Sequence, residues 1–340
     1  MKVVVTGGYF DASGEGVVWH LDFIAERAEV MLRWVPPPLL KVATKGFAGG
    51  SLSEDGTLFV AAHAAVVRID PRRALVTGIL HQPCMNDLHD VAVHEGLLYV
   101  SNTGLGAVDV FGLDGTFLGS HALLPAWANA RRIGGLDLPV GGPPVRPGWS
   151  GDSPEPWATH REPDGYHATD RFSAPFHRLK VPDHLHVNHV TPLGNRLIAT
   201  CFADGCLRDL QTFAVVKCLP ELFLHDGQVE GHSLWLTAIN GTLVELNAAT
   251  LAETRRLAVF ETGHYGWCRG LAIDDNRILV GLTEVREDRL PRHRWADRNA
   301  RGSETSVLLI ERSSGRLLSR IDLSDKERHS KLYSIVPLDV

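Results

Sequence analysis

One sequence pattern recurs along this chain and limits its possible folds more than any other feature. A short polar segment, often with a histidine, is followed by a turn and then by an apolar run that is typical of a β-strand. The pattern is found at 88–100, 184–200, 224–236 and 268–280. Where no insert intervenes, successive copies lie about 40 residues apart, which is the period of a four-stranded propeller blade. Helical periodicity is nearly absent, so we predict an all-β protein.

The two ends of the chain supply the parts of one further blade. Residues 332–340 resemble an inner strand with nothing after it, and residues 2–9, 16–24 and 28–35 resemble outer strands with nothing before them. Pairing of the N- and C-terminal strands would close the ring and remove exposed sheet edges. Complete units are expected at 46–82, 87–124, 184–220, 225–261 and 267–323. We therefore predict a six-bladed β-propeller that occupies residues 1–340 as a single domain.

Two inserts interrupt this repeat. Residues 125–182 hold 10 of the 19 prolines together with Trp127, Trp149 and Trp157. We expect an ordered loop over one face of the ring, anchored by these tryptophans, although a disordered linker is the alternative. Residues 284–304 contain six arginines and five acidic residues. This composition favours a solvated loop that neutralises itself, with an anion clamp as the functional alternative.

Bulk properties exclude several classes of protein. The net charge of -6 gives no support for a nucleic-acid-binding surface, and no run of 18 apolar residues predicts a membrane span. The N-terminal residues are predicted to form a strand rather than a signal peptide. Five cysteines without a C-x-x-C pair argue against a disulfide framework, and we expect Cys201, Cys218 and Cys268 to be packed as small hydrophobic residues. These features predict a reduced, cytoplasmic protein.

The candidate site follows from propeller geometry. The first strand of each blade lines the central channel, so equivalent positions in different blades form a ring of side chains. His186 lies two residues before Asn188 and is expected to face the same way, because side chains alternate along a strand. When the units are aligned by their second strands, five residues fall at one level: His89, Asn188, His225 and Arg269, with Gly49 from the first unit.

Three histidines in this ring suggest a metal-assisted enzyme. We expect His89, His186 and His225 to bind a divalent transition metal (Zn, Fe, Mn or Cu), with open positions for a small polar or anionic substrate. Arg269 would hold an anionic group, and Asn188 would add a polar group at the same level. The remaining candidates for catalysis or for orienting the ligands, provided the backbone turns there, are Asp90 and Asp226.

Two other interpretations remain open. In one, the same histidines act without metal, as nucleophile or general base, and Arg269 stabilises a transferred group. In the other, the histidines only cap backbone groups and the protein is an interaction scaffold that binds a protein partner through the 125–182 loop. Among the other histidines, His189 is expected to pack between blades, whereas His264 and His329 could reach the mouth of the channel.

The fifth unit carries a family resemblance. The segments Trp267-Cys268-Arg269-Gly270-Leu271-Ala272-Ile273 and Val280-Gly281-Leu282-Thr283-Glu284-Val285-Arg286-Glu287 resemble a bacterial six-bladed β-propeller family of unknown function. A fainter similarity is to arylsulfate sulfotransferases, which place His-x-Asn on one inner strand and His-Asp on another. Here the similar residues are His186-Val187-Asn188 with His89-Asp90 or His225-Asp226. That resemblance implies histidine-dependent transfer of sulfate.

Overall fold

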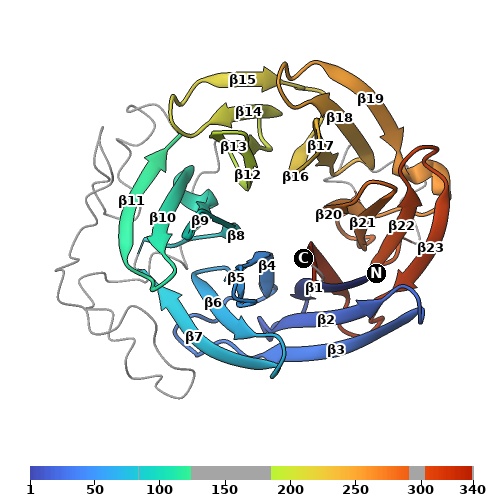
Figure 1. Ribbon diagram of the computed structural model, residues 1–340. Helices are drawn as coiled ribbons and strands as arrows, with labels where there is room; N and C mark the ends of the chain where they lie inside the picture. Colours follow the sequence, from blue (N-terminus) through green and yellow to red (C-terminus); the bar gives the residue numbers. More distant parts are fainter. Residues whose placement is uncertain (83, 124–184, 291–302, 339–340) are drawn as a thin grey trace.

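The computed structural model is a ring of six four-stranded antiparallel sheets around a central channel (Figure 1). It describes residues 1–82, 84–123, 185–290 and 303–338. The predicted six-bladed β-propeller is confirmed. The 125–182 insert with its tryptophans lies outside the described residues, as does the middle of the 284–304 insert.

Each blade begins with the strand that lines the channel. The blade that contains both chain ends consists of β24 (Ser330–Pro337), β1 (Lys2–Tyr9), β2 (Gly16–Asp22) and β3 (Arg27–Trp34). The next blade consists of β4 (Phe47–Leu52), β5 (Leu58–Ala62), β6 (Ala65–Asp70) and β7 (Leu75–His81). It is followed by β8 (Leu88–His94), β9 (Leu97–Asn102), β10 (Ala107–Gly112) and β11 (Phe117–Ala122).

The second half of the ring repeats this arrangement. One blade consists of β12 (Val187–Leu193), β13 (Arg196–Cys201), β14 (Cys206–Asp209) and β15 (Val215–Cys218). Its neighbour consists of β16 (Leu224–Glu230), β17 (Ser233–Ala238), β18 (Thr242–Asn247) and β19 (Glu253–Ala258). The last consists of β20 (Trp267–Ile273), β21 (Arg277–Thr283), β22 (Ser306–Glu311) and β23 (Leu317–Asp322). Two short 3-10 helices accompany these strands, η1 (Thr103–Leu105) and η4 (Val259–Thr262).

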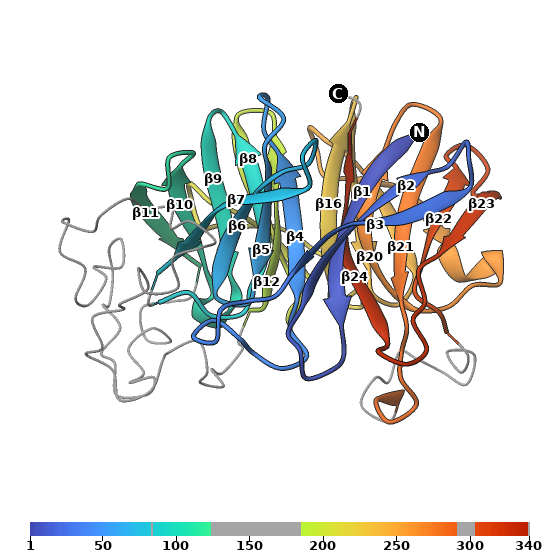
Figure 2. The same ribbon diagram turned by 90° about the horizontal axis from the view of Figure 1, so that it is seen from below.

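The ring is closed by the chain ends, as the sequence predicts. Strand β24 pairs with β1, with Val5 opposite Ile335 and Val4 opposite Val336. In Figure 2 both termini lie at the upper end of the molecule, so β24 and the other channel-lining strands begin at the lower end. We call this lower opening the mouth of the channel.

Apolar side chains fill the spaces between neighbouring blades. One such core joins Val3 and Val17 to Leu279 and Val307 of the adjacent blade, and each of these side chains is fully buried. Burial of a valine or leucine side chain stabilises a fold by about 1.5–3 kcal/mol. The apolar strands therefore hold the blades together as well as each blade internally.

Threonine hydroxyls add a second connection between blades. Each of these hydroxyls lies at the mouth end of a strand or just after it and donates a hydrogen bond to a backbone carbonyl at the start of the next inner strand. The bonds are Thr6 to Ala48 (2.5 Å), Thr103 to Val187 (2.6 Å), Thr200 to His225 (2.7 Å) and Thr283 to Leu332 (3.0 Å). They fix the start of four of the six inner strands, β4, β12, β16 and β24, where the candidate site lies.

The cysteine prediction is wrong for one residue. Cys206 and Cys218 are directly opposite each other on β14 and β15 and form a disulfide, with a Cα–Cα distance of 4.1 Å. The number of cysteines in the sequence could not reveal this pair, because its formation depends on which residues of the two strands lie opposite each other. Cys201 and Cys268 are unpaired and buried, as expected. None of the helices that the structure describes is long and apolar enough to span a bilayer.

Candidate functional site

A β-bulge interrupts each of the six inner strands near the mouth. The register shifts lie between Phe47 and Gly50, Leu88 and Asp90, Val187 and His189, Leu224 and Gly227, Arg269 and Leu271, and opposite the Thr6/Gly7 step of β1. The residues left without a direct partner include His89, Asn188, His225 and Tyr333. A bulge redirects the local side chains, and bulges are frequent beside active sites. The level at which the sequence predicts polar residues is therefore the level at which the inner strands bulge.

Three of the predicted residues meet around Tyr333. The guanidinium carbon of Arg269 lies 3.9 Å from the centre of the Tyr333 ring. The rings of His89 and His225 lie 6.1 Å and 6.4 Å from the same ring, centre to centre. His186 joins them on one side, with its ring 4.5 Å from that of His89. Residues from five blades thus converge at the mouth, and Tyr333 is the central member that the sequence analysis did not single out.

The backbone before several inner strands has an unusual conformation. Thr44, Asp87, His186 and His329 all have positive φ, between 52° and 60°, and each lies one to three residues before an inner strand. Non-glycine residues adopt this region only at a cost, and such strain concentrates at functional sites. His186 therefore reaches His89 through a left-handed turn, not through the strand alternation that we expected.

Hydrogen bonds fix the tautomers of His89 and His225. His89 Nδ1 lies 2.9 Å from the carbonyl oxygen of Asp87, which can only accept, so Nδ1 carries the proton. His225 Nδ1 lies 3.0 Å from the Asp226 carboxylate. Burial lowers the pKa of both imidazoles, and the neighbouring His186 lowers that of His89 further. Both rings are thus neutral near pH 7, and Nε2 is the ring nitrogen that can accept a proton or a ligand.

The two candidate carboxylates differ in what they contact. Asp226 Oδ2 lies 3.0 Å from His225 Nδ1 and accepts a 2.6 Å hydrogen bond from the backbone N–H of Gly270. Burial would raise the pKa of Asp226, but His225 and these hydrogen bonds lower it to about 2. Asp90 instead lies 2.9 Å from Nδ1 of His189, in the next blade. Asp226 can therefore orient an imidazole of the site, whereas Asp90 and His189 connect blades.

Asn188 lies at the predicted level but between blades. Its side-chain Nδ2 donates a 2.9 Å hydrogen bond to the carbonyl oxygen of Leu224, and the residue is 1% exposed. Its Oδ1 is buried and has no hydrogen-bond partner among the described residues. The structure thus joins Asn188 to the next inner strand, and a catalytic role for it stays a prediction.

Two lysines complete the site and were missed from the sequence. Lys45 and Lys331 line a small cavity at the mouth together with His63, Asp87, His89 and Tyr333. Lys45 forms a 2.5 Å ion pair with Asp87, while Lys331 is 2% exposed and its Nζ donates to the carbonyl oxygen of Thr44. Neither lysine belongs to a histidine motif, and Lys331 lies one residue before the inner strand that the repeat predicted.

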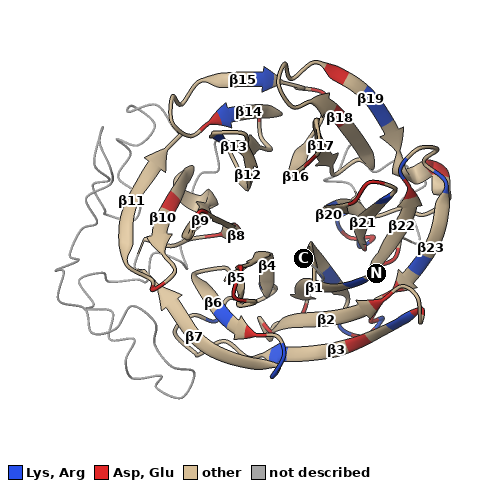
Figure 3. Cartoon of the chain, viewed as in Figure 1, with Lys and Arg blue, Asp and Glu red and all other residues tan. Residues whose placement is uncertain are grey.

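These cations change the properties of Tyr333. Burial alone would raise the pKa of its hydroxyl, but the charges of Arg269, Lys331 and Lys45 lower it to about 8. Elsewhere the charges are carried mainly by outer strands and loops, where both signs are mixed (Figure 3). Three cations thus act on one buried tyrosine in a protein whose net charge is -6.

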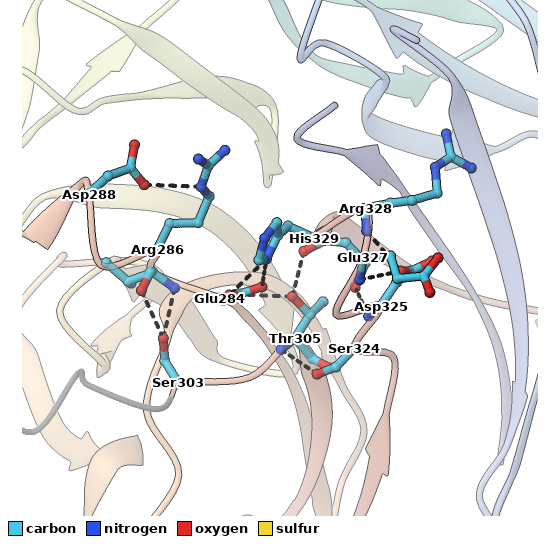
Figure 4. Close-up of polar contacts among 12 residues, drawn as sticks. Glu284, Arg286, Asp288, Ser303, Thr305, Ser324, Asp325, Glu327, Arg328 and His329 are labelled. Atoms are coloured by element: carbon cyan, nitrogen blue, oxygen red, sulfur yellow. Dashed lines mark hydrogen bonds and ion pairs between the residues drawn. The ribbon is translucent and has the colours of Figure 1, made fainter. Parts of the chain in front are cut away.

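A polar cluster at the same end joins the two loops that flank the mouth (Figure 4). His329 Nδ1 lies 3.1 Å from both carboxylate oxygens of Glu284, whose backbone N–H bonds to the Thr305 hydroxyl at 3.0 Å. Arg286 pairs with Asp288 at 3.0 Å, and the expectation that the whole 284–304 loop neutralises itself stays a prediction. Burial and the charge of Arg320 lower the pKa of His264, and its approach to the mouth stays a prediction.

The predicted metal ligands do not form a closed ligand set. Within the described ranges, no group of three or more His, Cys, Asp or Glu residues is arranged to hold a metal ion. The ring of His89 is adjacent to that of His186. The ring of His225 is instead a neighbour of Tyr333, which also contacts the ring of His89. Metal binding by His89, His186 and His225 stays a prediction.

Fold and site together define a six-bladed β-propeller with a buried cationic mouth. No model of a known protein family matches the chain, and no curated protein matches it in sequence. Among solved structures it is similar to a protein of unknown function from Bacteroides caccae, with a TM-score of 0.62 and 9% identity over 100% of this chain and 99% of that chain. A chain of a nidogen/laminin complex gives a TM-score of 0.57 and 10% identity over 99% and 98% of the two chains.

A third similar structure is a putative 6-phosphogluconolactonase from Bacteroides fragilis, with a TM-score of 0.52 and 12% identity over 96% of this chain and 83% of that chain. At these identities the comparisons establish the fold and nothing about the chemistry.

Proposed function

We propose that the protein is an enzyme whose channel mouth binds a small anionic molecule. The observation that carries this proposal is the excess of buried positive charge. Arg269, Lys45 and Lys331 surround Tyr333, whereas among the carboxylates that the structure describes only Asp87 forms an ion pair with one of them. Buried charges are costly unless they are paired, so an anion that enters the mouth would supply the missing partner.

Acid–base groups stand beside this anion site. The Asp226 carboxylate orients His225 through Nδ1 and would stabilise the imidazole when Nε2 takes up a proton as a base. This arrangement suits removal of a proton from the bound molecule or from water. We infer general acid–base catalysis by His225 and His89, with Arg269 as the anion holder.

Anion binding tests the proposal directly. We expect inorganic phosphate, sulfate or acetate at low millimolar concentration to raise the melting temperature of the wild type in a saturable way. Arg269→Gln should weaken the apparent affinity at least about tenfold, because a hydrogen bond to a charged group contributes about 1.5–3 kcal/mol.

Arg27→Gln is the matched control, since this arginine side chain is 70% exposed and lies opposite Asp22, which pairs with Lys2 at the start of β1, away from the mouth. It should retain the wild-type response, including any general effect of these salts on stability. Equal saturable shifts in both variants, or no saturation in the wild type, would exclude anion binding at Arg269.

Metal-assisted catalysis is the second candidate. It is favoured by the anchored Nδ1 atoms of His89 and His225, because metal-bound histidines commonly donate their other ring N–H to an acceptor. The three nearby cations oppose it by repelling a divalent ion. Elemental analysis for Zn, Fe, Mn and Cu decides between the two: stoichiometric metal that disappears in the His89→Ala, His225→Ala double variant would establish the metal enzyme.

The remaining alternatives stay proposals with less support. Histidine-dependent group transfer would use Nε2 of His225 as the nucleophile, but the comparisons give no support to an arylsulfate sulfotransferase. An interaction scaffold would bind a protein partner through the 125–182 loop. We retain a small-molecule substrate, without nucleic acid or membrane, and a cytoplasmic location as proposals. Formation of the Cys206–Cys218 disulfide in cells would instead indicate an oxidising compartment.

A further inference from the structure

Three cysteines of one blade lie side by side across its strands. Cys201 on β13 is directly opposite Cys206 on β14, and Cys206 is directly opposite Cys218 on β15. Directly opposite residues of an antiparallel sheet have Cα atoms about 4.5–5.5 Å apart, and disulfides span Cα distances of about 4.4–6.8 Å. The central Cys206 therefore has a cysteine within disulfide distance on either side, although only Cys218 is its partner in the structure.

The packing around these strands shows that the cysteines share one face of the blade. Cys201 and Ala199 belong to the apolar core on the side of the preceding blade, whereas Ile198 and Leu207 belong to the core on the opposite side. Successive side chains of a strand alternate between faces, so Cys206, next to Leu207, points to the same face as Cys201. The three sulfur atoms thus form a row that crosses three neighbouring strands.

This row runs from the protein interior to solvent. Cys201 is fully buried, Cys206 is 6% exposed, and Cys218 on the outermost strand is exposed. Burial raises the pKa of the Cys201 thiol from 9.0 to about 12, and a hydrogen bond with the Arg208 guanidinium acts in the opposite direction. A thiol at Cys218 would ionise in contact with water. The unpaired thiol is therefore at the least reactive end of the row, and the disulfide occupies the reactive end.

We propose that Cys201, Cys206 and Cys218 form a thiol–disulfide exchange site that takes up a low-molecular-weight disulfide at Cys218. Exchange requires a thiol beside one sulfur of a disulfide, and the row supplies this arrangement with Cys206 as the middle sulfur. Arg208 would stabilise the negative charge that develops on Cys201 as its proton is lost. The site does not depend on anion binding at the channel mouth.

Both steps of the exchange conserve the number of disulfides. In the first step Cys201 loses its proton to water and its thiolate attacks Cys206 Sγ. The Cys201–Cys206 bond forms, and the Cys206–Cys218 bond breaks with its electron pair on Cys218 Sγ. In the second step the Cys218 thiolate attacks a small disulfide, forms a mixed disulfide with one half and releases the other half as a thiolate. The small disulfide is the only co-reactant.

Trapping of the Cys218 thiol tests the first step. The oxidised wild type is alkylated in its folded state with iodoacetamide at pH 8, and the remaining thiols are blocked with N-ethylmaleimide under denaturing conditions at pH 6. Trypsin then places Cys201 and Cys206 on one peptide, 197–208, and Cys218 on another, 218–255. We expect the disulfide that links the two peptides to be replaced by one within 197–208, with the iodoacetamide label on Cys218.

Two variants identify the attacking sulfur. Cys201→Ser should label Cys218 at least about tenfold more slowly than the wild type, because no neighbouring thiol can displace it. Cys268→Ser removes another fully buried thiol, from the last blade, and should label Cys218 at the wild-type rate. Equal labelling of Cys218 in Cys201→Ser and the wild type would overturn the exchange.

The wild type alone also decides the matter, whatever the stability of the variants. A Cys206–Cys218 disulfide that stays intact throughout, or labelling of Cys268 as fast as Cys218, would overturn the proposal, because the second result shows that the fold has opened. Glutathione disulfide in place of iodoacetamide tests the second step. We expect one glutathionyl group, on Cys218, and its absence from Cys218 when iodoacetamide does label this residue would exclude uptake of a small disulfide.

Discussion

Replacement of His189 by glutamine should make stability depend on pH in a characteristic way. His189 lies on β12, and its Nδ1 is 2.9 Å from Oδ2 of Asp90 on the neighbouring blade. The Asp90 side chain is only 3% exposed and accepts a second hydrogen bond, of 3.3 Å, from the backbone N–H of Val190. Glutamine can still donate a hydrogen bond to Asp90 but carries no charge. The variant therefore removes the ion pair and keeps the polar contact.

The magnitude follows from the pKa of His189. Burial would lower this pKa, but the Asp90 carboxylate, with a smaller effect of Asp226, raises it from 6.5 to about 9. One pKa unit is equivalent to about 1.4 kcal/mol, so the charged form stabilises the fold by about 3 kcal/mol. Because the folded pKa is the higher one, this contribution is complete below pH 6.5. It is lost as the pH rises through about 9.

Urea unfolding of the wild type and of His189→Gln at pH 6 and at pH 10 measures this difference. We expect the variant to lose about 2–3 kcal/mol at pH 6 and less than about 1 kcal/mol at pH 10. His232→Gln, at an exposed histidine, should change neither value. A loss at pH 10 as large as that at pH 6 would show that packing, and not charge, makes His189 important.

Further predictions concern stability away from the imidazoles. Reduction of the Cys206–Cys218 disulfide, or Cys206→Ser, should lower the free energy of unfolding by about 2–4 kcal/mol in urea titrations, and intact-mass analysis before and after alkylation should show one disulfide in the oxidised protein. Thr283→Val should cost about 1–3 kcal/mol, because the Thr283 hydroxyl bonds to both the carbonyl oxygen and the N–H of Leu332. An unchanged urea midpoint in Thr283→Val would argue against the threonine bonds between blades.

Much of the fold could be read from the sequence because it depends on local periodicity. The apolar second strands and the turns before them recur at a nearly constant spacing, and each strand pairs mainly with its neighbours in the chain. The terminal segments could be joined because 332–340 lacked later strands and 2–9 lacked an earlier one. Ring closure then followed from the need to pair both edges.

The site could be predicted only in part, because the bulges break the alternation of side chains. His89, His225 and Arg269 were found since each follows the repeat. Asp90 was placed with them but contacts His189 of the next blade.

By itself, the sequence determined the number of blades, the way the ring closes and the level at which polar residues collect, because these depend on repeated short-range patterns. Only the tertiary structure decided which side chains meet there. Tyr333 and Lys331 come from the last strand, Lys45 from the approach to the first complete blade, and Cys206 pairs with Cys218 through strand register. Contacts between residues so far apart depend on the closed ring and on its bulges, which no local pattern encodes.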